Sequence, residues 1–153
     1  MLIGQYHSKV SLKGRIAFPK KFRDVLGDQL VLTLGYEGSL IIVSNDNWKS
    51  LISGTEDKPF FMGSARDTNR FLLGSASEVN LDEQGRFVIP PYLRDYAKIV
   101  SEVVFLGLNQ YVEVWEKGRW LEHQKYLSEH IEEIAEKLGE IDLSKDRARQ
   151  GRG

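Results

Sequence analysis

Gly14-Arg15-Ile16-Ala17-Phe18-Pro19-Lys20-Lys21-Phe22-Arg23-Asp24 recurs 71 positions later as Gly85-Arg86-Phe87-Val88-Ile89-Pro90-Pro91-Tyr92-Leu93-Arg94-Asp95. The Gly, Arg, Pro, Arg and Asp positions are identical in the two stretches, and the positions between Arg and Pro keep their apolar character. Self-similarity at a fixed spacing indicates a duplicated module. With one inserted residue the repeat continues, because residues 31–35 resemble residues 103–107. We therefore expect two similar halves of about 70 residues each.

Composition places the chain among ordinary globular proteins. Of its 153 residues 41% are hydrophobic and 28% are charged, which is typical of a soluble domain. No apolar run approaches the roughly 18 residues that a membrane-spanning helix needs, and the first residues do not resemble a secretion signal. The absence of cysteine excludes disulfides and thiolate metal sites, and it fits a reducing cytosol.

The repeated halves favour a shared β-rich core. Units of this size bury too little surface to be stable alone, so the copies are expected to form a pseudo-dimer. Alternating and β-branched runs bounded by Gly, Asn and Pro predict hairpins, one from residues 30–34 and 39–43 and the other from residues 103–107 and 111–115. Pro19 and Pro90 end a strand and suit the first turn of a helix. The expected fold class is mainly β with short helices (α+β).

Composition shifts define the expected boundaries. Apolar residues within residues 60–73 predict a packed helical connector, and apolar steps of three, four and seven residues from Trp120 to Leu138 predict an amphipathic helix. The polar residues after Gly139 predict disorder. The resulting segments are a first module (1–56), a helical connector (57–73), a second module (74–119), a C-terminal helix (120–138) and a disordered tail (139–153).

Charge is distributed unevenly between the halves. Residues 1–73 carry ten Lys/Arg against seven Asp/Glu, and residues 74–153 carry eleven against fifteen, so the halves are +3 and −4. Residues 9–23 contain six cations and no acid, which predicts an anion-binding face. The second copy has Gln84, Pro91 and Tyr92 where the first has lysines, so the first copy is the better phosphate binder. The six cations are Lys9, Lys13, Arg15, Lys20, Lys21 and Arg23.

Signals of catalysis or cofactor binding are weak. The chain has no Cys, and its only imidazoles are His7, His123 and His130, none within a known catalytic or zinc-binding motif. It also lacks a Walker loop and a dinucleotide-binding fingerprint. The sequence therefore predicts no enzyme activity, no metal site and no cofactor.

The paired Gly-Arg-x-x-x-Pro elements, the second of them preceded by Asp as Asp-x-x-Gly-Arg-x-x-x-Pro and each followed by a Phe/Leu-Arg pair, resemble the tandem AbrB-like (SpoVT-AbrB) modules of the MraZ family of bacterial transcriptional regulators. The resemblance extends to about residue 138. It implies two swapped-hairpin β modules joined as a pseudo-dimer, and ring-like homo-oligomers. It also implies binding to short direct repeats in double-stranded DNA upstream of a cell-division and cell-wall gene cluster, and a cytoplasmic, nucleoid-associated protein without catalytic activity.

The family motif Asp-x-x-x-Arg corresponds to Asp82 and Arg86, whereas the first copy has Ser11 before Arg15. Losing a negative charge beside Arg15 leaves that loop more cationic and more available to phosphates. The motif residues to which we assign structural roles are Ser11, Gly14, Pro19, Asp82, Gly85, Pro90 and Arg94.

These observations favour a sequence-specific DNA-binding regulator. Arg15 is expected to bond a base edge, with guanine favoured because a guanidinium reaches its O6 and N7 together. Arg86 is expected either to contact DNA or to form a buried structural pair with Asp82. The other cations of residues 9–23 are expected to hold phosphates. One alternative is an antitoxin-like module whose residues 120–153 bind a protein partner, and another is a hydrolase that uses His7 or His123.

Overall fold

The computed structural model of the chain describes residues 1–56 and 62–150, with side chains for residues 1–53 and 62–141. The chain divides into two compact units, one formed by Met1–Lys117 and the other by the residues from Gly118 onward. The first unit contains both copies of the repeat. The two copies are therefore parts of one folded body.

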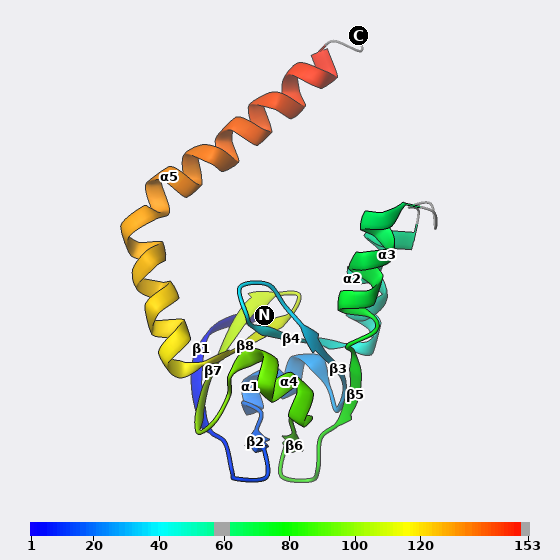
Figure 1. The fold of residues 1–153 in the computed structure, drawn as a ribbon, viewed down its shortest axis with the longest axis vertical. Helices are drawn as coiled ribbons and strands as arrows, with labels where there is room; N and C mark the ends of the chain where they lie inside the picture. Colours follow the sequence, from blue (N-terminus) through cyan, green and yellow to red (C-terminus); the bar gives the residue numbers. More distant parts are fainter. Residues whose placement is uncertain (57–61, 151–153) are drawn as a thin grey trace. The chain divides into compact units, whose positions relative to one another are not determined.

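Within the described residues, the first unit has a six-stranded antiparallel sheet and a separate two-stranded ribbon (Figure 1). The order of strands in the sheet is β1-β7-β8-β4-β3-β5, and the ribbon pairs β2 with β6. The strands are β1 (Leu2–Lys9), β2 (Arg15–Ala17), β3 (Gln29–Leu34), β4 (Leu40–Ser44), β5 (Ser77–Asn80), β6 (Arg86–Val88), β7 (Glu102–Asn109) and β8 (Val112–Glu116).

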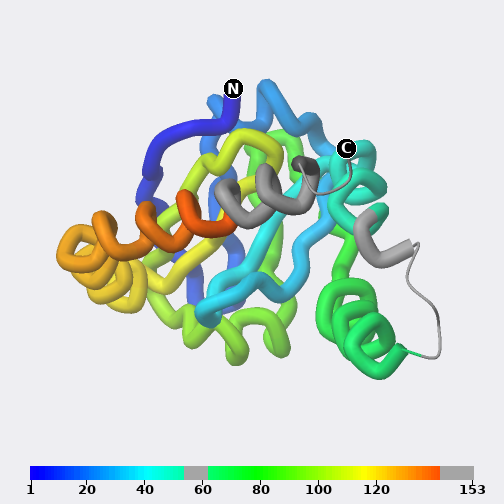
Figure 2. The backbone as a smooth tube through the Cα atoms, turned by 90° about the horizontal axis from the view of Figure 1, so that it is seen from above, coloured from blue at the N-terminus to red at the C-terminus, as the bar shows by residue number. Residues whose placement is uncertain are grey.

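The first strand of each copy pairs with the hairpin of the other copy. β1 lies along β7 with Leu2 opposite Asn109 and Lys9 opposite Glu102, and β5 lies along β3. Figure 2 shows this exchange as the blue N-terminal strand beside the yellow-green segment. Because the strand order is symmetric about the β4–β8 pair, the sheet has an approximate two-fold relation between copies. The predicted swapped-hairpin pseudo-dimer is confirmed, as are both predicted hairpins.

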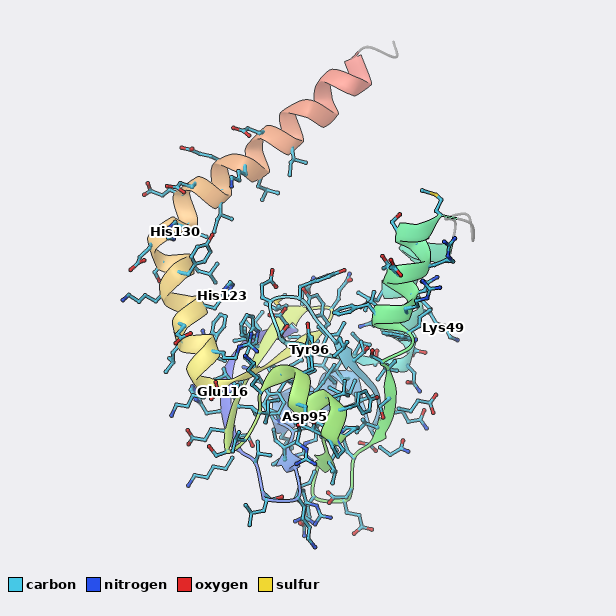
Figure 3. The ribbon with its side chains drawn as sticks, in the orientation of Figure 1. Lys49, Asp95, Tyr96, Glu116, His123 and His130 are labelled. Atoms are coloured by element: carbon cyan, nitrogen blue, oxygen red, sulfur yellow. The ribbon has the colours of Figure 1, made fainter. Side chains whose placement is uncertain are left out.

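Two short helices follow the repeated prolines. α1 (Lys20–Leu26) begins after Pro19 and α4 (Pro91–Ala97) begins after Pro90. Proline suits these positions because the first N–H groups of a helix have no partner within it. On α4, which Figure 3 marks with Asp95 and Tyr96, the Tyr96 hydroxyl donates to the Gly35 carbonyl of the first copy at 2.9 Å. This bond also crosses between the copies.

In the described part of the chain two helices lie between β4 and β5, and the sequence predicted only the second of them. α3 (Gly63–Leu72) confirms the predicted helix over those residues, and residues 57–61 lie outside the described part. The preceding α2 (Asn45–Glu56) was not predicted. Its start is capped by Ser44, whose Oγ accepts the Asn47 N–H at 3.1 Å, as a serine N-cap commonly does. Along the chain, α2 follows β4 in the first copy as the C-terminal helix follows β8 in the second.

The core of the first unit combines side chains from both copies. Phe18 and Phe22 of the first copy are 2% and 0% exposed, and Phe87 and Phe105 of the second are 5% and 0% exposed. The Phe18 ring lies 5.4 Å from the Phe105 ring at an interplanar angle of 78°, an edge-to-face contact. One continuous cluster of buried residues links the copies, so the expectation of a shared core is met.

The C-terminal helix, α5, spans Lys117–Gln150. It begins three residues before the predicted start, and it continues across Gly139 into the segment that we expected to be disordered. The prediction of disorder is wrong for residues 139–150, and residues 151–153 lie outside the described part. Residues 140–150 contain no Pro or Gly and are mostly good helix formers, so polarity alone was a poor guide to disorder there.

Candidate nucleic-acid interface

The ribbon formed by β2 and β6 has one buried and one exposed face. Ile16 faces Phe87 across the two strands, and these side chains are 1% and 5% exposed. Side chains alternate along a strand, so the neighbours of Ile16 and Phe87 lie on the opposite face. Arg15 is paired with Val88 and Ala17 with Arg86. The two arginines therefore occupy diagonal positions on the same outer face of the ribbon, a separation that long side chains can span.

Two glycine loops lead into the ribbon strands. The first glycine loop is residues 11–15 and the second is residues 82–86, and both project to the same side of the unit (Figure 1). In each loop the glycine N–H donates to the carbonyl three residues earlier, at 2.9 Å in both copies. Gly14 and Gly85 have φ of +81° and +73°, which an L-residue adopts only at a steric cost.

The first residue of each glycine loop has the same backbone role in both copies. Ser11 Oγ accepts the Arg15 N–H at 3.0 Å, and Asp82 Oδ1 accepts the Arg86 N–H at 2.8 Å. Ser11 thus replaces the aspartate as a backbone acceptor without supplying its charge. In the second loop Asp82 also accepts the Gln84 N–H at 2.9 Å. The second glycine loop is therefore held by more bonds than the first.

Asp82 and Arg86 form an ion pair at the surface. Arg86 Nε lies 3.0 Å from Asp82 Oδ2, and both side chains are 39% exposed. Of the two alternatives for Arg86, the buried structural pair with Asp82 is therefore wrong. The bond from the Arg86 backbone N–H, aided by the Arg86 side chain, holds the pKa of the Asp82 carboxyl below its ordinary value.

The cations of residues 9–23 are mostly exposed and unpaired. Arg15 and four lysines lie at the surface, and within the described residues none of these five side chains has an ion pair or hydrogen bond. They lie at the end of β1, in the first glycine loop, on β2 and at the start of α1, within the segment for which the sequence predicted an anion-binding face. The four lysines are Lys9, Lys13, Lys20 and Lys21.

Arg23, the sixth predicted cation, lies elsewhere. It is half-buried on α1, and a Cβ placed on Gly85 would overlap its guanidinium. Its counterpart Arg94 lies in the same way against Gly14, where an added Cβ would come within 2.6 Å of Arg94 Cζ. Each arginine thus packs on the glycine loop of the other copy. Sequence reasoning missed these contacts because they join residues about 60 to 80 positions apart.

Other kinds of site find little support. His123 and His130 lie on α5 (Figure 3), where both rings stack on Tyr126 at centroid distances of 5.7 and 4.4 Å. Among the described residues there is no group of three or more His, Cys, Asp or Glu side chains suited to a metal ion. In the same part of the chain, no helix has the length and apolar character required to cross a membrane.

Comparison with known proteins identifies relatives of the whole chain. The profile of a family described as "MraZ protein, putative antitoxin-like" matches twice, at residues 1–71 and 72–142. A protein of Caldanaerobacter subterraneus subsp. tengcongensis named transcriptional regulator MraZ is 41% identical over 143 residues, which cover 94% of this chain and 100% of the relative. A protein of the same name from Thermoanaerobacter pseudethanolicus has the same identity and coverage.

Among solved structures, the solution structure of PHS018 from Pyrococcus horikoshii aligns over 74% of this chain and 88% of that chain. Its identity of 16% and TM-score of 0.29 are too low to support any argument. Each of the two profile matches contains one copy of the repeat, and the relatives match nearly from end to end. The chain belongs to the MraZ family.

Proposed function

We propose that this protein is a sequence-specific DNA-binding transcriptional regulator whose β2–β6 ribbon enters the major groove. The proposal rests on the outer face of the ribbon, on which Arg15 and Arg86 occupy diagonal positions. The unpaired lysines of residues 9–23 lie on the neighbouring segments of the chain. The major groove is wide enough to admit a two-stranded ribbon. The name of the relatives, transcriptional regulator MraZ, supports the same function.

Arg15 is the residue best suited to read a base. Its side chain is exposed, and within the described residues it has no bonded partner. A free guanidinium donates two parallel bonds to guanine O6 and N7, a pairing that discriminates by about 1–3 kcal/mol. Arg86 uses its Nε to bond Asp82, which leaves the other donors of its guanidinium for DNA. Both arginines are therefore assigned to DNA, with the stronger discrimination at Arg15.

The exposed lysines of the first copy are assigned to phosphates. Lysine acts on a phosphate as a point charge and does not require a fixed planar geometry. If four lysines each neutralise one phosphate, log Kd changes by about 3.6 per unit of log salt for each bound protomer. Affinity per protomer then falls by about a hundredfold between 50 and 200 mM salt.

Binding as an oligomer would combine several such contacts. The halves of the chain carry +3 and −4, so a head-to-tail contact between them can close a ring. α5 also exposes several large apolar residues that a second copy can cover, among them Ile131, Leu138 and Ile141 at 53%, 62% and 53%. A ring that places protomers on successive direct repeats gains affinity by multivalency. We also propose that such direct repeats lie in promoter DNA and that the protein is associated with the nucleoid.

Neither alternative has a comparable observation behind it. An enzyme needs converging catalytic groups, and His123 and His130 instead pack on Tyr126. An antitoxin-like role requires a protein partner for α5. The family description includes the word antitoxin-like, but the exposed residues of α5 are equally suited to self-association.

The decisive experiment is selection of bound sequences from random duplex DNA, followed by titration of the recovered site at several salt concentrations. The expected outcome is a set of short repeated motifs, a steep salt dependence, and a loss of about 5- to 150-fold per contacting protomer for Arg15→Ala. An affinity that is independent of both sequence and salt would refute the proposal.

A further inference from the structure

Each glycine loop is enclosed by the opposite copy. The Gly14 carbonyl accepts the Ile89 N–H at 2.9 Å, and the Gly85 carbonyl accepts the Phe18 N–H at 2.9 Å. The strand end that supplies this donor leads, through the repeated proline, into the helix that carries Arg94 or Arg23. The opposite copy therefore touches each loop twice, once by a backbone bond and once by a guanidinium.

At the first glycine loop, Arg94, Ile89 and Gly14 contact one another in turn. Arg94 Nε donates to the Ile89 carbonyl at 2.9 Å, and Ile89 itself donates to Gly14. The Arg94 guanidinium then occupies the space into which a Gly14 side chain would project, with Cζ and Nε both 2.6 Å from an ideal Cβ. The guanidinium thus fills the space left by the glycine and limits the movements open to its backbone.

The two contacts differ in strength. Arg23 Nε is buried and has no hydrogen-bond partner within the described residues, whereas Arg94 Nε is bonded. The loops differ in the opposite sense, because the second is held by the Asp82 carboxylate and the first has only Ser11. The loop with fewer internal bonds is therefore the one with the better-anchored arginine.

We propose that Arg94 and Arg23 are positioning residues that order the glycine loop of the opposite copy, and that Arg94 fixes the loop carrying Lys13 and Arg15. Neither arginine holds a phosphate in this assignment, which replaces the phosphate role predicted for Arg23. Only the expected effect on DNA binding rests on the proposed function. Its physical content, the ordering of a loop by a residue of the other copy, is measurable without DNA.

The first test is amide hydrogen exchange of the free full-length protein, followed by NMR. Arg94→Ala is expected to speed exchange at Gly14 and Arg15 by about tenfold, because both amides are bonded to Ser11 only while the loop is closed. Amides of the central strands β4 and β8 serve as the internal control and are expected to stay protected. Arg23→Ala is expected to affect Arg86 less, since Asp82 still accepts its N–H. Unchanged exchange at Gly14 and Arg15 would overturn the proposal.

Arg94→Lys separates packing from charge. Lysine keeps the positive charge but lacks the planar group and the Nε donor. Loop exchange in this variant is expected to match that of Arg94→Ala. Full protection restored by lysine would show that charge alone suffices and would overturn the proposal.

A double-mutant cycle tests the contact itself. Gly14→Ala is expected to lower the melting temperature more when Arg94 is present than in the Arg94→Ala background, because the overlap with the guanidinium exists only in the former. Gly27 provides a matched control, since its φ is also +81° and nothing lies within 4 Å of its ideal Cβ. Coupling between Gly14 and Arg94 no larger than that between Gly27 and Arg94 would contradict the proposed contact.

Titration with the selected DNA distinguishes positioning from phosphate binding. Arg94→Ala is expected to reduce the ratio of selected-site to scrambled-site affinity by about tenfold, within the range for one well-placed base contact, and to leave the salt slope unchanged. Lys20→Ala is the comparison, with a slope smaller by about 0.9 and an unchanged ratio. A salt slope reduced by about 0.9 in Arg94→Ala would show that Arg94 contacts a phosphate, and would overturn the positioning role. If the unsubstituted protein shows no sequence preference, the proposed function fails while the exchange experiment still decides the loop contact.

Discussion

Replacing Phe18 by alanine tests whether the two copies share one core. The side chain is 2% exposed and belongs to the first copy. Its ring lies 6.1 Å from that of Phe22 in the same copy, but also 6.2 Å from Phe87 and 5.4 Å from Phe105 in the second copy. The substitution therefore leaves a cavity lined by both halves of the repeat.

The expected loss of stability is large. Phe→Ala in a well-packed core costs about 3–5 kcal/mol, which is a considerable part of the roughly 5–15 kcal/mol that stabilises a typical domain. With a urea slope of about 2 kcal/mol/M, the unfolding midpoint falls by about 2 M. Leu12→Ala is the control, because Leu12 is 103% exposed and such a surface change costs about 0.5 kcal/mol or less.

The assay follows one tryptophan from each copy. Variants that retain only Trp48, on α2 of the first copy, or only Trp115, on β8 of the second, are unfolded in urea with and without Phe18→Ala. Protein concentration is held fixed, since self-association also shifts the midpoint. Both tryptophans are expected to report the same transition and the same shift. A Trp115 transition that Phe18→Ala leaves in place would refute the shared core.

Three further outcomes follow from the structure. The pKa of Asp82 is lower in the folded protein than the ordinary value for an aspartate, about 4, so its contribution to stability is present above about pH 4 and is lost as pH falls through the lower folded pKa. The difference in stability between the wild type and Asp82→Asn should therefore shrink on acidification below pH 4, and a difference that grows would contradict this sign. Arg86→Ala should change thermal melting little, because the pair with Asp82 is 39% exposed, yet should weaken binding to the selected DNA; a large fall in melting temperature would restore the structural role that we rejected. Replacing Ile131 and Leu138 by glutamate should reduce the proposed oligomer to smaller species in analytical ultracentrifugation, since both side chains are more than half exposed. An unchanged sedimentation coefficient would exclude α5 from the contact.

Local signals in the sequence were sufficient for much of the fold. The repeat predicted the pseudo-dimer, Pro19 and Pro90 predicted the starts of α1 and α4, and alternation predicted the β3–β4 and β7–β8 hairpins. These features depend on local conformational preferences of the residues and on the spacing of apolar residues, and both can be recognised within the sequence of a single copy. α2 was missed although Ser44 and the apolar residues after it form a recognisable helix start, and the polar end of α5 was misread as disorder.

The arrangement of the site depended on contacts between the copies. From sequence alone, Arg86 was as consistent with a buried pair as with DNA, and Arg23 counted simply as one more cation. Strand exchange and register place Arg15 and Arg86 on one face of the ribbon and bring Arg94 against Gly14. Residues 71 or more positions apart meet because strands of one copy pair with strands of the other, as in β1–β7, β2–β6 and β4–β8. The sequence by itself determined which residues carry the charge, and the tertiary structure decided which of them face outward and which hold a loop of the other copy, because that division depends on register and packing across the copies.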